Sequence, residues 1–236
     1  KDLKGKIKII NNKVEGADIL AFYNNSQNIK FTIRTNDQGE KITTLFSSKA
    51  KPLVDRYKFI KGFKDDREGY LDFYSVKKNG VLTSKLVIDN FKVKDIPALA
   101  KLLALASLQG IADLLTGEGI RFTDFEMNFI NQDKLIKIKE LYAIGPAISI
   151  LLEGYIEENK LISLRGTLVP ATTINRSIAS IPLLGDLLIG KKVGEGVFGV
   201  SFKIKGPPKD LETTVNPIKT LTPRFITRTL EKIKKN

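Results

Sequence analysis

The sequence predicts a mainly β fold of the α+β class: one antiparallel sheet, two apolar amphipathic helices and a short basic C-terminal helix. Three observations support this. Apolar and polar residues alternate along most of the chain, Asn-rich and Gly-rich turns separate the alternating runs, and the period changes to that of a helix in two places. The 236 residues fit one large domain, with a strand meander over 1–94 and a helix-containing region over 95–236.

Runs with period 2 dominate the first ninety residues. In "KGKIKII", Ile7 and Ile9 fall on one face and the intervening Lys8 falls on the other. "NIKFTIRT" and "YLDFYSV" alternate in the same way, and turn signals such as Asn11-Asn12 and Asn79-Gly80 separate the runs. Beyond the first helix, "LIKIKE", "AISILLEGYIEE", "NKLISLRGTLV", "GVFGVSFKIKG" and "LETTVN" extend the pattern. We expect an antiparallel meander with one buried and one hydrated face.

The first helix is expected in "DIPALAKLLALASLQGIADLLTGEG". Asp95 is the expected N-cap, Pro97 lies in the first turn, and a continuous helix from Ile96 to Leu115 is expected to end near Gly117. Its wide apolar face and narrow polar stripe indicate a helix that lies on a sheet or on lipid. Charged residues such as Lys101 make a membrane-spanning segment unfavourable.

The second helix is expected from about Thr172. Apolar residues recur there at spacings of three and four from Ile174 to Leu188, and Pro182 is expected to kink or break the helix. The tail "TPRFITRTLEKIKKN" is expected to form the short basic helix. It lies on a membrane surface or caps the last strands, and the sequence leaves both possibilities open.

The composition argues against an enzyme. The chain has no His, no Cys and no Trp. Zinc sites of the usual kind, thiol nucleophiles, Ser-His relays and disulfides are therefore excluded. We expect no catalytic residue, metal site or cofactor.

Two phosphate-binding patterns occur in the sequence, and neither has the context it needs. "GDLLIGKK" (185–192) resembles a P-loop, but its middle residues continue a helical stripe and its last residue is not Ser or Thr. "GEGVFG" (194–199) matches a dinucleotide fingerprint, but a strand-like run follows it where a helix is required. We therefore expect no nucleotide partner.

The net charge of +13 lies mainly in the two flanks of the chain. Residues 94–195 carry 11 basic and 12 acidic side chains, so the most apolar part is neutral. A nucleic-acid-binding protein would concentrate charge on its recognition element. We expect no nucleic acid, although a basic polyanion-binding domain stays open as an alternative.

Three stretches resemble the C-terminal region of AsmA-like proteins of the YhdP type, in an alphaproteobacterial-like version. They are "SLQGIADLLTGEGIRF" (107–122), "GTLVPATTINRSIASIPLLGDLLIGKKVGEGVFGVSFKIKGP" (166–207) and "VNPIKTLTPRFI" (215–226). The resemblance is collinear over residues 95–225, and the first ninety residues share only the strand-rich character. One departure is Lys209-Asp210-Leu211, where the family usually has Asp-Pro.

The resemblance implies a segment of a periplasmic protein that is anchored in the inner membrane of a Gram-negative bacterium. Its fold would be a strongly curved antiparallel sheet that forms an open groove with an apolar concave face. Phospholipids would move along that groove between the inner and outer membranes, with the membrane surface and other envelope proteins as further partners. An envelope assembly module, whose helices only plug the groove, is the alternative.

Two sets of residues are candidates for these contacts. The expected lipid contacts lie on the apolar stripes of the two helices: Leu103, Leu108, Ile111, Leu115, Ile174, Ile178, Ile181, Leu184 and Leu188. The expected membrane contacts lie in the tail: Arg224, Phe225, Arg228, Leu230, Lys232, Lys234 and Lys235.

Overall fold

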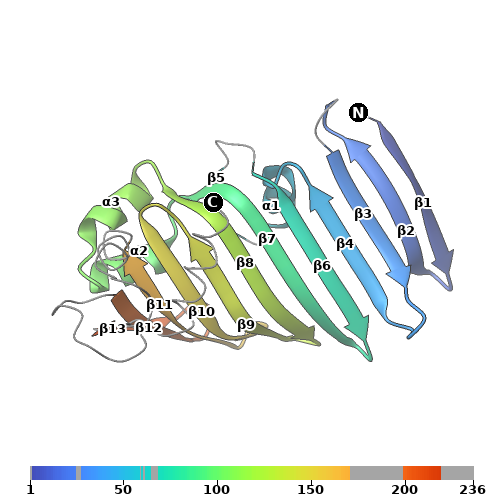
Figure 1. The fold of residues 1–236 in the computed structure, drawn as a ribbon. Helices are drawn as coiled ribbons and strands as arrows, with labels where there is room; N and C mark the ends of the chain where they lie inside the picture. Colours follow the sequence, from blue (N-terminus) through green and yellow to red (C-terminus); the bar gives the residue numbers. More distant parts are fainter. Residues whose placement is uncertain are drawn as a thin grey trace, which may run out of the picture.

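The protein contains one open antiparallel sheet of thirteen strands (Figure 1). A computed structural model describes residues 2–24, 28–58, 60, 62–64, 69–170 and 199–218. The strands are β1 (Leu3–Ile10), β2 (Lys13–Phe22), β3 (Asn28–Thr35), β4 (Lys41–Ser47), β5 (Phe63–Lys64), β6 (Leu71–Lys78), β7 (Val81–Val93), β8 (Ile120–Gln132), β9 (Leu135–Ile144), β10 (Ile148–Glu157), β11 (Leu161–Pro170), β12 (Gly199–Gly206) and β13 (Glu212–Ile218). The helices of the described part are α1 (Lys51–Tyr57), α2 (Pro97–Leu105) and α3 (Gln109–Thr116).

Neighbours in the sequence are neighbours in the sheet, with one exception. Twelve strands follow the order β1-β2-β3-β4-β6-β7-β8-β9-β10-β11-β12-β13, and the short β5 pairs with the end of β7. β1 and β13 lie at opposite ends of this order and do not pair, so the sheet is not closed (Figure 1). The prediction of a mainly β, antiparallel fold is confirmed.

Tight turns account for this meander. Asn11 and Asn12 both have positive φ, as do Asn79 and Gly80. Two consecutive left-handed residues are what a two-residue hairpin of type I′ requires, and Asn and Gly adopt that conformation at low cost. The turn predictions at these positions are confirmed.

Three short helices share one core with one face of the sheet. Val54 of α1, Leu103 of α2 and Leu115 of α3 are almost fully buried, and they belong to the same cluster as Ile88 of β7 and Leu168 of β11. α2 also contacts β13, and α3 contacts β8. We call this the apolar face, and the helices cover part of it.

The first predicted helix is in fact two helices. Ser107 takes the left-handed conformation with φ of 57°, and α2 ends before it. The Ser107 N–H donates to the Ala104 carbonyl, and the Leu108 N–H donates to the Leu103 carbonyl. These two bonds form a Schellman motif, which ends a helix. The prediction of a continuous helix from Ile96 to Leu115 is therefore wrong.

The predicted N-cap is also wrong. Asp95 has φ of 53°, and the N-cap position belongs to Ile96, which makes no side-chain capping bond. The backbone N–H of Asp95 instead donates to the carbonyl of Leu115 at 3.2 Å, which ties the start of α2 to the end of α3. Pro97 does open α2, and α3 does end at Gly117, as predicted.

α1 was not predicted from the sequence. It spans only seven residues, its N-cap position is Ala50, and no side chain caps it. The second predicted helix and the basic tail lie outside the described residues. Both phosphate-binding patterns do so as well, apart from Gly199, which begins the expected strand β12.

Candidate functional site: the apolar face of the sheet

A continuous row of side chains without a polar group crosses the apolar face. Residues directly opposite each other in an antiparallel pair project to the same face, so the strand register defines such rows. We call this one the apolar row, and its members are Gly5, Ile19, Phe31, Leu45, Phe73, Leu86, Met127, Leu141, Leu152, Gly166, Phe202 and Val215. Apart from Leu86 and Phe202, every member is at least partly exposed.

The helices cover the next row of side chains on the same face. We call it the core row, and its members are Leu3, Ala21, Ile29, Ser47, Leu71, Ile88, Phe125, Ala143, Ile150, Leu168, Val200 and Pro217. The row is largely buried from Ser47 to Val200 and becomes exposed towards both edges of the sheet. The helices thus cover the core row in the middle of the sheet and leave the apolar row partly open.

The opposite face carries a polar row behind the apolar one. From β1 to β9, every member of this row has a polar or charged group: Lys6, Asp18, Thr32, Thr44, Tyr74, Lys85, Asn128 and Glu140. Thr32 and Thr44 bond to each other across the strands at 2.7 Å, and Lys85 pairs with Glu126 at 3.2 Å. From β1 to β9 this polar row is therefore unsuited to an apolar ligand, in contrast to the apolar row on the other face.

A hollow of about 800 Å³ adjoins the apolar face where α2 meets α3. Its walls come from the α2–α3 joint, the β9–β10 turn and the nearby ends of β11, β12 and β13. Most lining residues are apolar: Leu105, Ala106, Leu108, Ile111, Pro146, Ala147, Pro170, Val200, Val215 and Pro217. Val215 belongs to the apolar row, so the hollow and the row are continuous.

The structure separates the four predicted lipid contacts of the first helix into two pairs. Leu103 and Leu115 are 0% exposed and belong to the core. Leu108 and Ile111 are partly exposed and line the hollow. The other five predicted lipid contacts (Ile174, Ile178, Ile181, Leu184 and Leu188) and all seven predicted membrane contacts lie outside the described residues.

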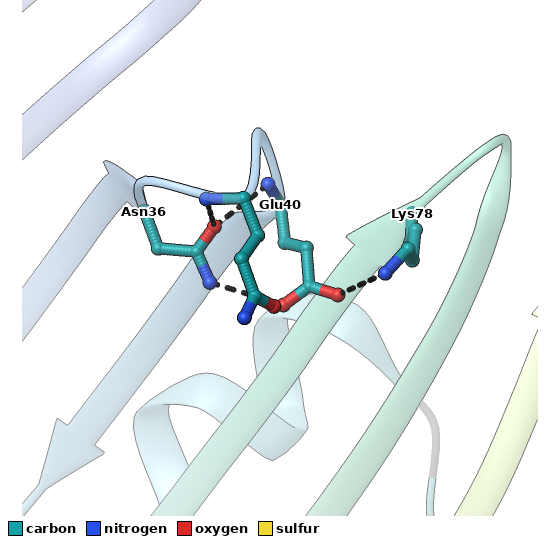
Figure 2. Close-up of polar contacts among 4 residues, drawn as sticks. Asn36, Glu40 and Lys78 are labelled. Carbon is teal, nitrogen blue, oxygen red and sulfur yellow. Dashed lines mark hydrogen bonds and ion pairs between the residues drawn. The ribbon is translucent and has the colours of Figure 1, made fainter.

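A second hollow, of about 530 Å³, lies on the opposite face between β6 and β9. Figure 2 shows the polar network at its rim, where Asn36 donates to Glu40 at 3.0 Å and Lys78 donates to the same carboxylate at 2.9 Å. The hydrogen bond from Lys78, and then that from Asn36, lower the pKa of Glu40 below its ordinary value. Lys78 and Lys85 are both in ion pairs, whereas Lys139, which also lines this hollow, is exposed and has no ion pair with a described residue.

The described residues contain no group of three or more potential metal ligands of the His, Cys, Asp or Glu type. Within the same part of the chain, none of the helices has both the length and the apolar character needed to cross a bilayer. The chain matches no protein-family model, no curated protein and no solved structure, so the resemblance to AsmA-like proteins stays a prediction.

Sequence reasoning placed the candidate contacts on the helices and missed those on the sheet. The alternation in "NIKFTIRT" and "YLDFYSV" already puts Phe31 and Phe73 on the apolar side of their strands. What the alternation cannot show is that Leu45 lies between them in register and joins them into one row. The strand order and the register carry that information.

Proposed function

We propose that this chain is a non-enzymatic segment of a periplasmic envelope protein that binds phospholipid acyl chains on its apolar face. In this proposal the sheet is curved into an open groove, and lipids move along it between the inner and outer membranes. The observation that carries the proposal is the apolar row, which crosses twelve strands without a polar side chain. At a strand spacing of about 4.8 Å the row extends for about 50 Å.

The physical argument concerns apolar surface that the protein leaves in water. Fully covering one large apolar side chain contributes about 1.5–3 kcal/mol, and the row offers many that are partly covered. An acyl chain lying along the row gains only a part of this contribution from each side chain, in proportion to the apolar area that it newly covers. Because the row itself has no polar side chain, an acyl chain meets no polar barrier from one strand to the next, which suits transport along the sheet.

An envelope assembly module is the second candidate. It is favoured by the burial of Leu103 and Leu115, because helices that pack tightly onto the apolar face support a plug. A photo-crosslinker at Leu108, which lines the hollow, separates the two candidates. Capture of phospholipid in cells supports transport, and capture of protein alone supports the plug. Leu114 is the matched control, because it is exposed on α3 without lining the hollow.

Mass spectrometry of organic extracts from the purified protein tests the proposal itself. Ile19 and Leu20 are adjacent in β2, and only Ile19 belongs to the apolar row. We expect phospholipid in extracts of the parent and of Leu20→Asp, and a loss of it in Ile19→Asp. A folded parent that purifies without lipid would contradict the proposal.

A further inference from the structure

Two lysines face each other at the margin of the apolar face. Lys41 of β4 and Lys77 of β6 are directly paired in register, four residues along their strands from Leu45 and Phe73 respectively. The even spacing puts them on the same face as the apolar row. Like charges directly opposite each other on one face of a sheet are destabilising, so the pair needs a compensating charge.

The protein supplies only part of that charge. Lys41 pairs with the Glu15 carboxylate at 3.2 Å and donates to the Val14 carbonyl at 2.9 Å. Lys77 is exposed and has no hydrogen bond or ion pair from its side chain to any other described residue. No other charged side chain occurs in this row of the sheet, which consists of Thr35, Lys41, Lys77, Leu82, Asn131, Ile136, Ile156, Ile162 and Gly206.

Hydroxyl groups separate the lysines from the apolar row. Between them, Thr43 of β4 is paired with Ser75 of β6, and Ser75 is paired with Ser84 of β7. Ser84 donates to Ser75 at 3.0 Å inside the sheet, whereas the Thr43 hydroxyl has no partner among the described residues. Each step of two residues along a strand covers about 6.8 Å. Along β4 and β6 the side chains therefore change from apolar to hydroxyl to cationic over about 14 Å.

We propose that Lys41 and Lys77 bind the phosphate of a phospholipid whose acyl chains lie on the apolar row. The proposal rests on the proposed function and adds a headgroup site to it. The Lys41 ammonium lies on the β2 side of β4, beside Glu15, so binding one phosphate with both lysines requires Lys41 to turn towards Lys77. The phosphate then gives both ammonium groups charge-assisted hydrogen bonds. The Thr43 hydroxyl is placed to donate to an ester oxygen between headgroup and chain. A lipid seated in this way has its headgroup at the exposed end of β4 and β6.

Titration of the 236-residue chain with two fluorescent lipids of identical acyl chains tests the proposal. One is phosphatidic acid, and the other is diacylglycerol, which lacks the phosphate. We expect Lys77→Gln to weaken phosphatidic acid binding by about three- to tenfold, since one partly exposed charge-assisted contact is lost. Diacylglycerol binding should stay unchanged, and Lys77→Arg should keep the parental affinity for phosphatidic acid.

Lys78→Gln is the matched control, because Lys78 is the next residue of β6, projects to the opposite face and pairs with Glu40. If both lipids bind and Lys77→Gln changes neither, the headgroup site is overturned while the proposed function stands. If neither lipid binds the parent, the proposed function itself fails. Displacement of phosphatidic acid by millimolar inorganic phosphate would assign the lysines to free phosphate and overturn the headgroup site.

Discussion

The middle of the core row and its β1 end contain the same kinds of residue in opposite surroundings. Leu71, Ile88 and Leu168, in the part that the helices cover, are 2%, 0% and 0% exposed. Leu3, at the start of the same row in β1, is 72% exposed, and Ile7 and Ile9 on the same strand are 56% and 63% exposed. Alternation alone does not distinguish these two parts. What differs is the cover, so the middle stabilises the fold, whereas the β1 end is open and leaves apolar surface for a ligand or a partner.

The positions of the three helices account for this difference in cover. α1, α2 and α3 supply Val54, Leu103 and Leu115 to the core, which they share with buried residues of β5 to β12. No described helix contributes a buried residue over β1 or β2. In those two strands only Ala17 is buried. The open end therefore depends on strand pairing and turns more than on a packed core.

The largest expected effect compares a core residue of the covered part with an apolar residue of the open end. Leu103→Ala should lower the free energy of unfolding by about 2–5 kcal/mol, because it removes a fully buried side chain and leaves a cavity. Ile7→Ala should change it by about 0.5 kcal/mol or less, as expected for an exposed position. Urea unfolding of both variants measures this difference. A similar cost for Ile7→Ala would mean that β1 is covered in solution.

An intermediate effect is expected at the joint between α2 and α3. Ser107 sits in the left-handed region, which costs an ordinary residue about 1–2 kcal/mol. Ser107→Gly should relieve this cost, partly offset by the greater freedom of Gly in the unfolded chain, and should raise the unfolding free energy by about 0.5–1 kcal/mol. Ser107→Val should lower it, because a β-branched residue is disfavoured there. Thermal or urea unfolding measures both variants. If both substitutions changed the free energy of unfolding in the same direction, the Schellman interpretation would be wrong.

The smallest effect concerns the polar network at the strand ends. NMR titration should find the pKa of Glu40 below its ordinary value, and Lys78→Gln should raise it again, because the hydrogen bond from Lys78 is the main cause of the shift. A lowered carboxylate pKa stabilises the folded state fully at pH values above the ordinary pKa. That contribution is lost as pH falls through the lowered pKa. An unchanged Glu40 pKa in the variant would show that the bond at 2.9 Å does not persist in solution.

Much of the sheet could be predicted because each strand encodes its own alternation. β3 coincides with "NIKFTIRT", and the turn at Asn79-Gly80 is where the residue types require it. The break between α2 and α3 could not be predicted in this way, because Ser occupies the left-handed position where Gly is usual. α1 lacks a polar cap and is too short for a clear period.

The candidate site could be predicted only in part, because its sheet residues are brought together by register. Leu108 and Ile111 could be selected from the helical stripe, and they do line a hollow. Nothing in the sequence pairs Lys41 with Lys77, because α1 and β5 separate their strands along the chain. Such long-range pairings depend on strand order, which alternation does not specify.

The claim that one face of the sheet carries phospholipid is tested most directly along a single strand. In β3, Ile29, Phe31 and Ile33 lie on the apolar face, and Lys30, Thr32 and Arg34 lie on the opposite face. A photo-crosslinker placed at each position in turn, in cells, should capture phospholipid at the first three positions and not at the other three. Equal capture on both faces, or capture only at Lys30, Thr32 and Arg34, would contradict the account.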